Sequence, residues 1–187
     1  MVDLLKGGAV GMLEYTSIAA GMESADIMVK TADVYPIFFK TVCPGKFIAA
    51  ISGNVAAVEA AIQAGREVSP EVVADGFVIP NIHEDVISAM SGCIALGERA
   101  ALGVIETFSV AASVKAADAA AKASNVQILD VRTALGLGGK AFVLINGDVA
   151  AVQSAVEAGA YSAGQEGLLV RTTVIPRPSD AFFEQII

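Results

Sequence analysis

The chain has 187 residues, a formal net charge of −8, 55% hydrophobic residues and only 17% charged residues. The acidic balance, without a run of basic residues, argues against nucleic acid as a partner. No apolar stretch reaches the roughly 20 residues of a membrane-spanning helix, and residues 1–6 lack the apolar core of a secretory signal, so the sequence predicts neither a membrane partner nor export.

Size and apolar content indicate how the chain is organised. Its length fits one large domain or two of about 90 residues. A small protein this apolar has more hydrophobic surface than its own core needs, which predicts contacts with other subunits. The two cysteines, Cys43 and Cys93, cannot form a disulfide framework. They indicate the reducing cytoplasm, where a lone thiol can bind metal or take part in redox chemistry.

One pattern occurs twice along the chain. Matching segments lie 92 positions apart before the central turn, 94 after it and 96 near the end. They are residues 9–14 and 101–106, 17–20 and 109–112, Gly45-Lys46 and Gly139-Lys140, and 78–80 and 174–176. Because the offset changes only at loops, we predict two domains of one fold, residues 1–92 and 99–187, joined by a short linker.

Each copy predicts the element order β-α-β-β-α-β followed by a short helix. The first copy has a strand at 9–15, a helix after Ser17, a hairpin of 34–41 with 46–52, a helix from Asn54, a strand at 76–79 and a short helix at 84–90; the second has them at 101–107, after Ser109, at 126–133 with 140–146, from Asp148, at 168–175 and at 179–187. Ser, Asn and Asp are good N-caps, and Gly65 and Gly159 indicate the ends of the second helices. The fold class is therefore α+β, with helices packed on antiparallel sheets.

The central turn of the first copy, residues 40–46, carries Cys43 directly before Pro44 and Gly45. Proline presets φ and glycine accepts positive φ, so the chain is expected to reverse here and hold Cys43 near the tip of the hairpin. A free cysteine is more often a small buried hydrophobe. The residues alone leave both interpretations open.

Several segments resemble bacterial microcompartment shell domains: GMLEYTS at 11–17, VKTADV at 29–34, the helix starts at Asn54 and Asp148, and VIPRP at 174–178. Two copies without permutation resemble the tandem-domain shell proteins that form trimers. Within this group, TVCPGKF at 41–47 is similar to the turn of propanediol-utilisation shell proteins with an iron–sulfur cluster in the central pore. The resemblance covers nearly all of residues 8–187 and implies two tandem ferredoxin-like shell domains.

The resemblance also implies an assembly. Three chains form a pseudohexameric disc, and the discs join other shell proteins edge to edge in the microcompartment shell, within the cytoplasm. Two hairpin turns per chain line the central pore: Val42, Cys43, Pro44, Gly45 and Lys46, and Leu135, Gly136, Leu137, Gly138 and Gly139. Lys30, Lys122 and Arg177 match the edge residues of the family. The first copy has Asn81 where the arginine would be, which puts the edge contacts of that copy in doubt.

Cys43 connects this assembly to chemistry. A [4Fe–4S] cluster is usually held by four thiolates, and one chain offers a single cysteine in a turn. Around a threefold axis, three copies of Cys43 would supply three soft ligands at one point. The resemblance thus implies one [4Fe–4S] cluster per homotrimer, transferring electrons across the shell, with a possible redox enzyme as the partner inside.

Three other functions remain open from the sequence. The first is a shell tile with an open, gated pore that transports a small metabolite and binds no cluster. The second is an enzyme with its site between the repeats, which no convergent catalytic set supports, so we predict no enzymatic activity. The third is a small-molecule sensor of ferredoxin-like type, which would form compact dimers or tetramers.

The remaining polar and sulfur residues are given structural roles. Cys93 is expected to be a packed small residue, and the lone His83 a helix cap or surface contact. Lys46 and Lys140 either add positive charge near the axis or are simply solvated. Glu14 and Glu106, one in each copy, are interpreted as structural.

Overall fold

The structure is a computed structural model that describes residues 8–92, 97–133 and 136–186. Two compact units divide the chain: residues 1–82 with 134–139, and residues 83–133 with 140–187. Cys93 and Leu135 lie outside the described residues. None of the described helices combines the length and apolar character needed to cross a membrane.

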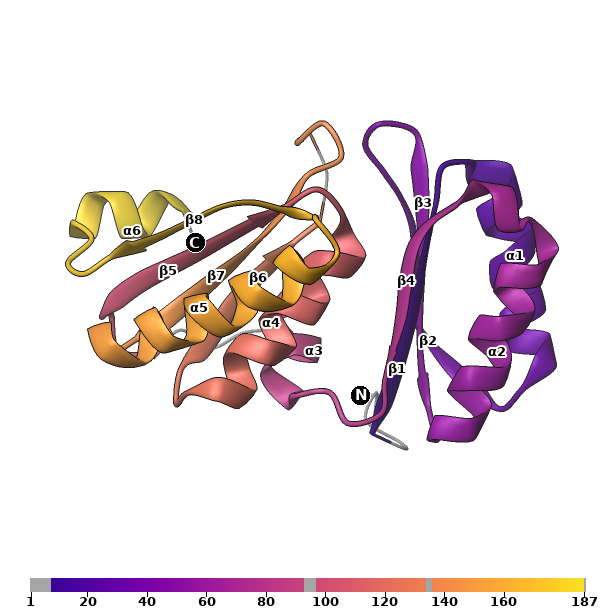
Figure 1. Ribbon diagram of the computed structural model, residues 1–187, viewed down its shortest axis with the longest axis horizontal. Coiled ribbons are helices and arrows are strands. Elements are labelled where there is room, and N and C mark those ends of the chain that lie inside the picture. Colours follow the sequence, from indigo (N-terminus) through magenta and orange to yellow (C-terminus); the bar gives the residue numbers. More distant parts are fainter. Residues whose placement is uncertain (1–7, 93–96, 134–135, 187) are drawn as a thin grey trace. The chain divides into compact units, whose positions relative to one another are not determined.

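The first unit is a four-stranded antiparallel sheet covered by two helices on one face (Figure 1). Its elements are β1 (Ala9–Tyr15), α1 (Ile18–Thr31), β2 (Val34–Val42), β3 (Lys46–Gly53), α2 (Val55–Val68), a short 3-10 turn (Pro70–Val72) and β4 (Val73–Ile79). The strand order is β2-β3-β1-β4, which is the ferredoxin-like order. The last strand of this unit, β4, begins at Val73, three residues earlier than the sequence predicts.

The second unit repeats this topology with the strand order β6-β7-β5-β8. Its elements are α3 (Glu84–Met90), β5 (Ala101–Thr107), α4 (Val110–Ala123), β6 (Gln127–Arg132), β7 (Ala141–Gly147), α5 (Val149–Gln165), β8 (Leu169–Ile175) and α6 (Asp180–Ile186). The predicted α+β fold with antiparallel sheets is confirmed in both units.

Helix starts follow the predicted caps. The side chain of Ser17 accepts a hydrogen bond from the Ala20 N–H, and Ser109 and Asn54 do the same for the third residue that follows each of them. Asp148 occupies the N-cap position of α5, but its side chain makes no capping hydrogen bond. Three of the four predicted caps thus satisfy an N–H group that a helix start leaves unpaired.

Gly65 and Gly159 have a role that the sequence did not predict. Both helices continue past them, to Val68 and to Gln165, so neither glycine ends a helix. A Cβ at Gly65 would lie 2.7 Å from Cγ of Met28, and one at Gly159 would lie 2.8 Å from the backbone oxygen of Ala116. These glycines allow the paired helices of each unit to pack closely, which a larger residue would prevent.

The short helix α3 ends the first copy in the sequence but packs in the second unit. It contacts β6 and α4, and Val86, Ile87, Ala89 and Met90 are buried there. Its counterpart α6 packs on the sheet of its own unit, where Phe183 belongs to a buried apolar cluster with Leu102 and Leu144. The two copies thus place equivalent helices on different surfaces.

Candidate pore turns and edge residues

Cys43 lies at the turn between β2 and β3, as predicted. Val42 and Lys46 are register partners at the end of this hairpin, and Gly45 between them has φ of 74°. The positive φ confirms why glycine is needed at the turn. The Cys43–Pro44 peptide is cis, the thiol is free and partly exposed, and Pro44 and Gly45 are exposed. Cys43 is thus partly exposed at the turn and does not lie in a buried core.

The second predicted pore turn is rich in glycines with positive φ: Gly136, Gly138 and Gly139 have values of 75°, 62° and 90°. It belongs to the same compact unit as Cys43. The N–H of Gly136 donates to Sγ of Cys43 at 3.4 Å, and a Cβ at Gly139 would lie 2.9 Å from Cδ of Pro44. The sulfur therefore has a backbone donor beside it.

Each copy pairs the lysine that follows its turn with the glutamate of its first strand. Nζ of Lys46 lies 2.8 Å from Oε1 of Glu14, whose side chain is fully buried. Nζ of Lys140 lies 2.8 Å from Oε1 of Glu106, and this pair is more exposed. Because each lysine has a carboxylate partner, the turns gain no uncompensated positive charge from Lys46 and Lys140. The glutamates are structural, as the sequence suggested.

The two predicted edge lysines are held by an aspartate one helical turn earlier. Lys30 pairs with Asp26 on α1, and Lys122 pairs with Asp118 on α4 at 2.6 Å. Asp118 also accepts the backbone N–H of His83 at 2.8 Å. His83 in turn caps α3, with its Nδ1 accepting the Asp85 N–H at 3.3 Å, which confirms the predicted helix cap.

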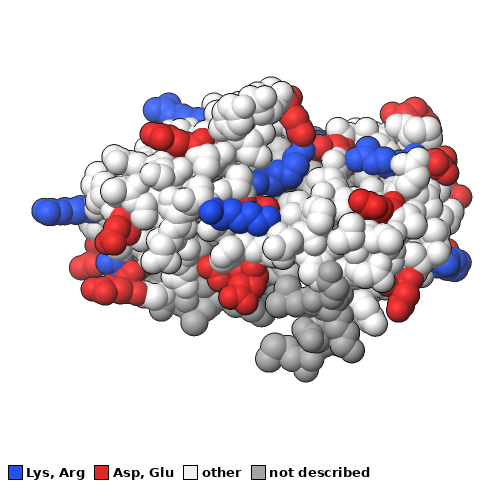
Figure 2. Space-filling model, turned by 60° about the horizontal axis from the view of Figure 1, so that its bottom comes forward, with Lys and Arg blue, Asp and Glu red and all other residues white. Residues whose placement is uncertain are grey.

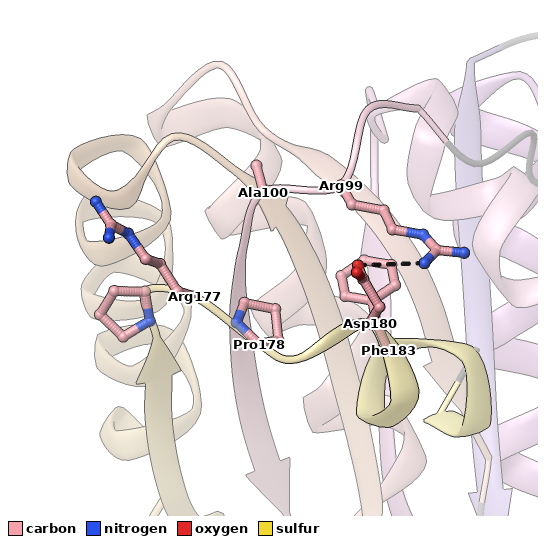
Figure 3. Close-up of a pocket in the computed structure, with 7 residues that line it drawn as sticks. Arg99, Ala100, Arg177, Pro178, Asp180 and Phe183 are labelled. Carbon is pink, nitrogen blue, oxygen red and sulfur yellow. Dashed lines mark hydrogen bonds and ion pairs between the residues drawn. The ribbon is translucent and has the colours of Figure 1, made fainter.

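Arg177, the third edge residue, is exposed beside a cavity of about 190 Å³ at the start of α6 (Figure 3). The ion pairs at this cavity belong to Arg99, which lies 3.2 Å from Glu184 and 3.5 Å from Asp180. In Figure 3 the guanidinium of Arg177 points away from Arg99, with Pro178 between them. Arg177 is therefore free to meet solvent or another molecule, whereas Arg99 anchors α6.

On the face drawn in Figure 2, lysines and arginines alternate with aspartates and glutamates among uncharged residues. Among the described residues, no group of three His, Cys, Asp or Glu side chains is placed to hold a metal ion. One chain therefore does not assemble a metal site within its described part.

Comparison with known proteins identifies the repeated domain. The BMC domain family matches the chain twice, over residues 9–82 and 101–178. The bacterial microcompartment shell protein PduT of Citrobacter freundii is 46% identical over 179 residues, which cover 96% of this chain and 97% of that protein. The carboxysome assembly protein CcmO of Synechococcus elongatus is 31% identical over 192 residues, covering 96% and 68%.

A solved structure agrees with these sequence matches. The crystal structure of a microcompartment protein from Desulfitobacterium hafniense DCB is 45% identical, has a TM-score of 0.87 and covers 94% of this chain and 98% of its own. The fold and the repeats define a tandem α+β domain protein. The chain belongs to the BMC-domain family of bacterial microcompartment shell proteins, with two BMC domains in tandem. The predicted family and the predicted place in the microcompartment shell are confirmed.

Proposed function

We propose that three copies of this chain form a pseudohexameric shell tile whose central pore holds one [4Fe–4S] cluster on three Cys43 thiolates. The tile would pass electrons across the shell, to or from a redox enzyme inside, and would join other shell proteins at its edges through Lys30, Lys122 and Arg177. The single observation behind this proposal is the free, partly exposed Cys43 at the turn of the β2–β3 hairpin.

The chemistry of Cys43 suits an iron–sulfur ligand. Thiolate sulfur is the ligand type of iron–sulfur clusters, and backbone N–H donors to the sulfurs help set their potential. The Gly136 N–H already donates to Cys43 Sγ. A Cβ at Gly136 or Gly138 would meet nothing within 4 Å, so these two positions of the turn face open space.

Symmetry supplies the ligands that one chain lacks. Each chain contributes one thiol at the turn, so three chains around an axis contribute three. When bound, the cluster would supply one-electron redox chemistry. The protein's own part is to bring the three sulfurs together and to screen the pore with two kinds of turn. Lys46 and Lys140 each keep a glutamate partner, so the bases of the turns stay close to neutral.

An anaerobic purification tests the cluster. We expect about four iron and four sulfide per three chains, together with the visible absorption of an iron–sulfur cluster. Cys43→Ser should lose both while keeping the same mass in solution. Cys93→Ser is the matched control, because it removes the other cysteine and should keep the iron. An iron-free, colourless wild type would refute the cluster and leave the gated metabolite pore as the better function.

The trimer has its own test. Light scattering should give three times the 19.0 kDa mass of the chain, with or without Cys43. A 19.0 kDa particle would refute the shared pore, because a single chain brings one thiol to it. Loss of two-dimensional assembly in Arg177→Ala, with the trimer intact, would support the proposed edge contacts.

A further inference from the structure

We propose that Asn146 is a deamidation site that the folded chain protects, and that its conversion to aspartate releases the segment leading into β5. We call residues 97–100, which precede this strand, the lead-in segment. The inference concerns a covalent modification and depends on neither the iron–sulfur cluster nor the trimer. It follows from the contacts of one buried amide and from the residue that comes after it.

The side chain of Asn146 holds the lead-in segment with both ends of its amide. Its Oδ1 accepts the N–H of Ala100 at 3.1 Å, and its Nδ2 donates to the backbone oxygen of Glu98 at 2.9 Å. A side-chain amide carries both a donor and an acceptor, so it satisfies the two backbone groups at once. The residue is only 4% exposed, so water does not readily replace these hydrogen bonds.

The first repeat shows that the fold itself does not require asparagine here. The residue equivalent to Asn146 is Ser52, 94 positions earlier. Its hydroxyl donates to the backbone oxygen of Tyr35 at 3.5 Å, on the neighbouring strand β2. The asparagine of the second repeat therefore serves the lead-in segment, which follows the first repeat in the sequence.

Two further contacts connect the lead-in segment to the second unit. The N–H of Gly97 donates to Oε1 of Gln127 at 3.2 Å, and the guanidinium of Arg99 pairs with Glu184 of α6 at 3.2 Å. Both contacts are exposed to solvent, and exposed pairs contribute little to stability. The buried hydrogen bonds of Asn146 are therefore the main attachment of this segment.

The residue after Asn146 is a glycine, which makes deamidation chemically easy. Asparagine is a thermolabile residue, and glycine has no side chain to hinder attack by its own backbone nitrogen. The deprotonated nitrogen of Gly147 attacks Cγ of Asn146 and closes a succinimide ring, while the Cγ–Nδ2 bond breaks and ammonia leaves. Water then opens the ring and gives aspartate or isoaspartate. No other asparagine in the sequence precedes a glycine.

Folding opposes the first step of this reaction, and the product weakens the attachment. Ring closure requires the amide to turn toward Gly147, which breaks both hydrogen bonds to the lead-in segment. An ionised aspartate has acceptors only, so its oxygen would repel the backbone oxygen of Glu98. Release of the segment then loosens one wall of the cavity that Arg99 and Ala100 line together with Arg177 (Figure 3).

Peptide mass spectrometry after incubation in mildly alkaline buffer measures the reaction. Trypsin cleavage after Lys140 and Arg171 places Asn146 in one peptide. We expect deamidation to be about tenfold or more slower in the folded wild type than in the chain unfolded by guanidinium chloride, because the hydrogen bonds must break first. Arg99→Ala, which frees the lead-in segment from α6, should deamidate faster than the folded wild type. Equal rates in the folded and unfolded chains, or no acceleration in Arg99→Ala, would overturn the proposed protection.

Hydrogen exchange measures the release. Asn146→Asp should raise the exchange rate of the lead-in segment about tenfold, while β5 and β7 keep their protection. Asn146→Ser carries the residue of the first repeat and adds no charge, so it gives the same test if the aspartate variant does not fold. Asn125→Asp is the matched control, because it makes the same charge change at an exposed position before β6. Wild-type exchange in a folded Asn146 variant, or an equal increase in Asn125→Asp, would overturn the proposal.

Discussion

Replacement of Gly159 by alanine tests whether this glycine is set by close packing. In α5, the new Cβ would lie 2.4 Å from Cδ1 of Ile105 and 2.8 Å from the backbone oxygen of Ala116. Ile105 is fully buried, and the backbone of α4 can move only with the helix. Overpacking of this kind costs about 1–3 kcal/mol, and the better helix propensity of alanine returns about 0.5–1 kcal/mol. We expect a net loss of about 1–2 kcal/mol in the free energy of unfolding.

Gly164 provides a control on the same helix. A Cβ there would meet nothing within 4 Å, so Gly164→Ala should gain about 0.5 kcal/mol from helix propensity alone. Urea unfolding followed by circular dichroism, at one protein concentration, measures both variants. If Gly159→Ala is as stable as the wild type, or if both variants shift in the same direction, the packing explanation is wrong.

Three further predictions concern polar groups, each measured by urea unfolding. Glu14→Gln should lower the free energy of unfolding by about 3 kcal/mol, because it leaves the partly buried Lys46 without its counter-charge. Glu106→Gln should lower it by less than about 1 kcal/mol, because the pair of Glu106 with Lys140 is more exposed. Equal losses in the two variants would contradict this order. Asn54→Ala should cost about 1 kcal/mol and Asp148→Ala much less, because only Asn54 makes a capping hydrogen bond. Burial raises the pKa of Tyr15 above its ordinary value of 10.0, against smaller lowering effects from a hydrogen bond and a nearby arginine. The neutral phenol is thus favoured in the folded state, so stability should be full below pH 10.0 and fall as the pH rises toward the folded pKa; Tyr15→Phe should remove this fall.

Local signals in the sequence were sufficient for the repeated fold and for the position of Cys43. The repeat offsets place equivalent elements in register, and the Pro-Gly pair specifies a chain reversal whose geometry depends on neighbouring residues alone. The caps at Ser17, Asn54 and Ser109 likewise depend on residues within one helical turn. Short-range chemistry of this kind can be read without knowing the tertiary structure.

Contacts between distant residues were harder to predict. A glycine near the end of an apolar helical pattern is typical of a helix end, so the sequence predicts that role for Gly65. Its close approach to Met28 depends on how two helices pack, which the sequence pattern does not show. The partners of Lys46 and Lys140 lie more than 30 residues away in the sequence, across the sheet. The pairing of Arg99 with Glu184 spans 85 residues and had no sequence signal.

The position of α3 has a consequence for how the chain can be divided. The sequence repeat closes after this helix, but its apolar side chains are buried in the unit that follows. A fragment that stops at residue 92 would carry Val86, Ile87 and Met90 without the surface on which they pack, and should aggregate. A fragment that stops at residue 82 would keep the first sheet with α1 and α2. It would leave α3 in the second unit, on whose residues this helix packs.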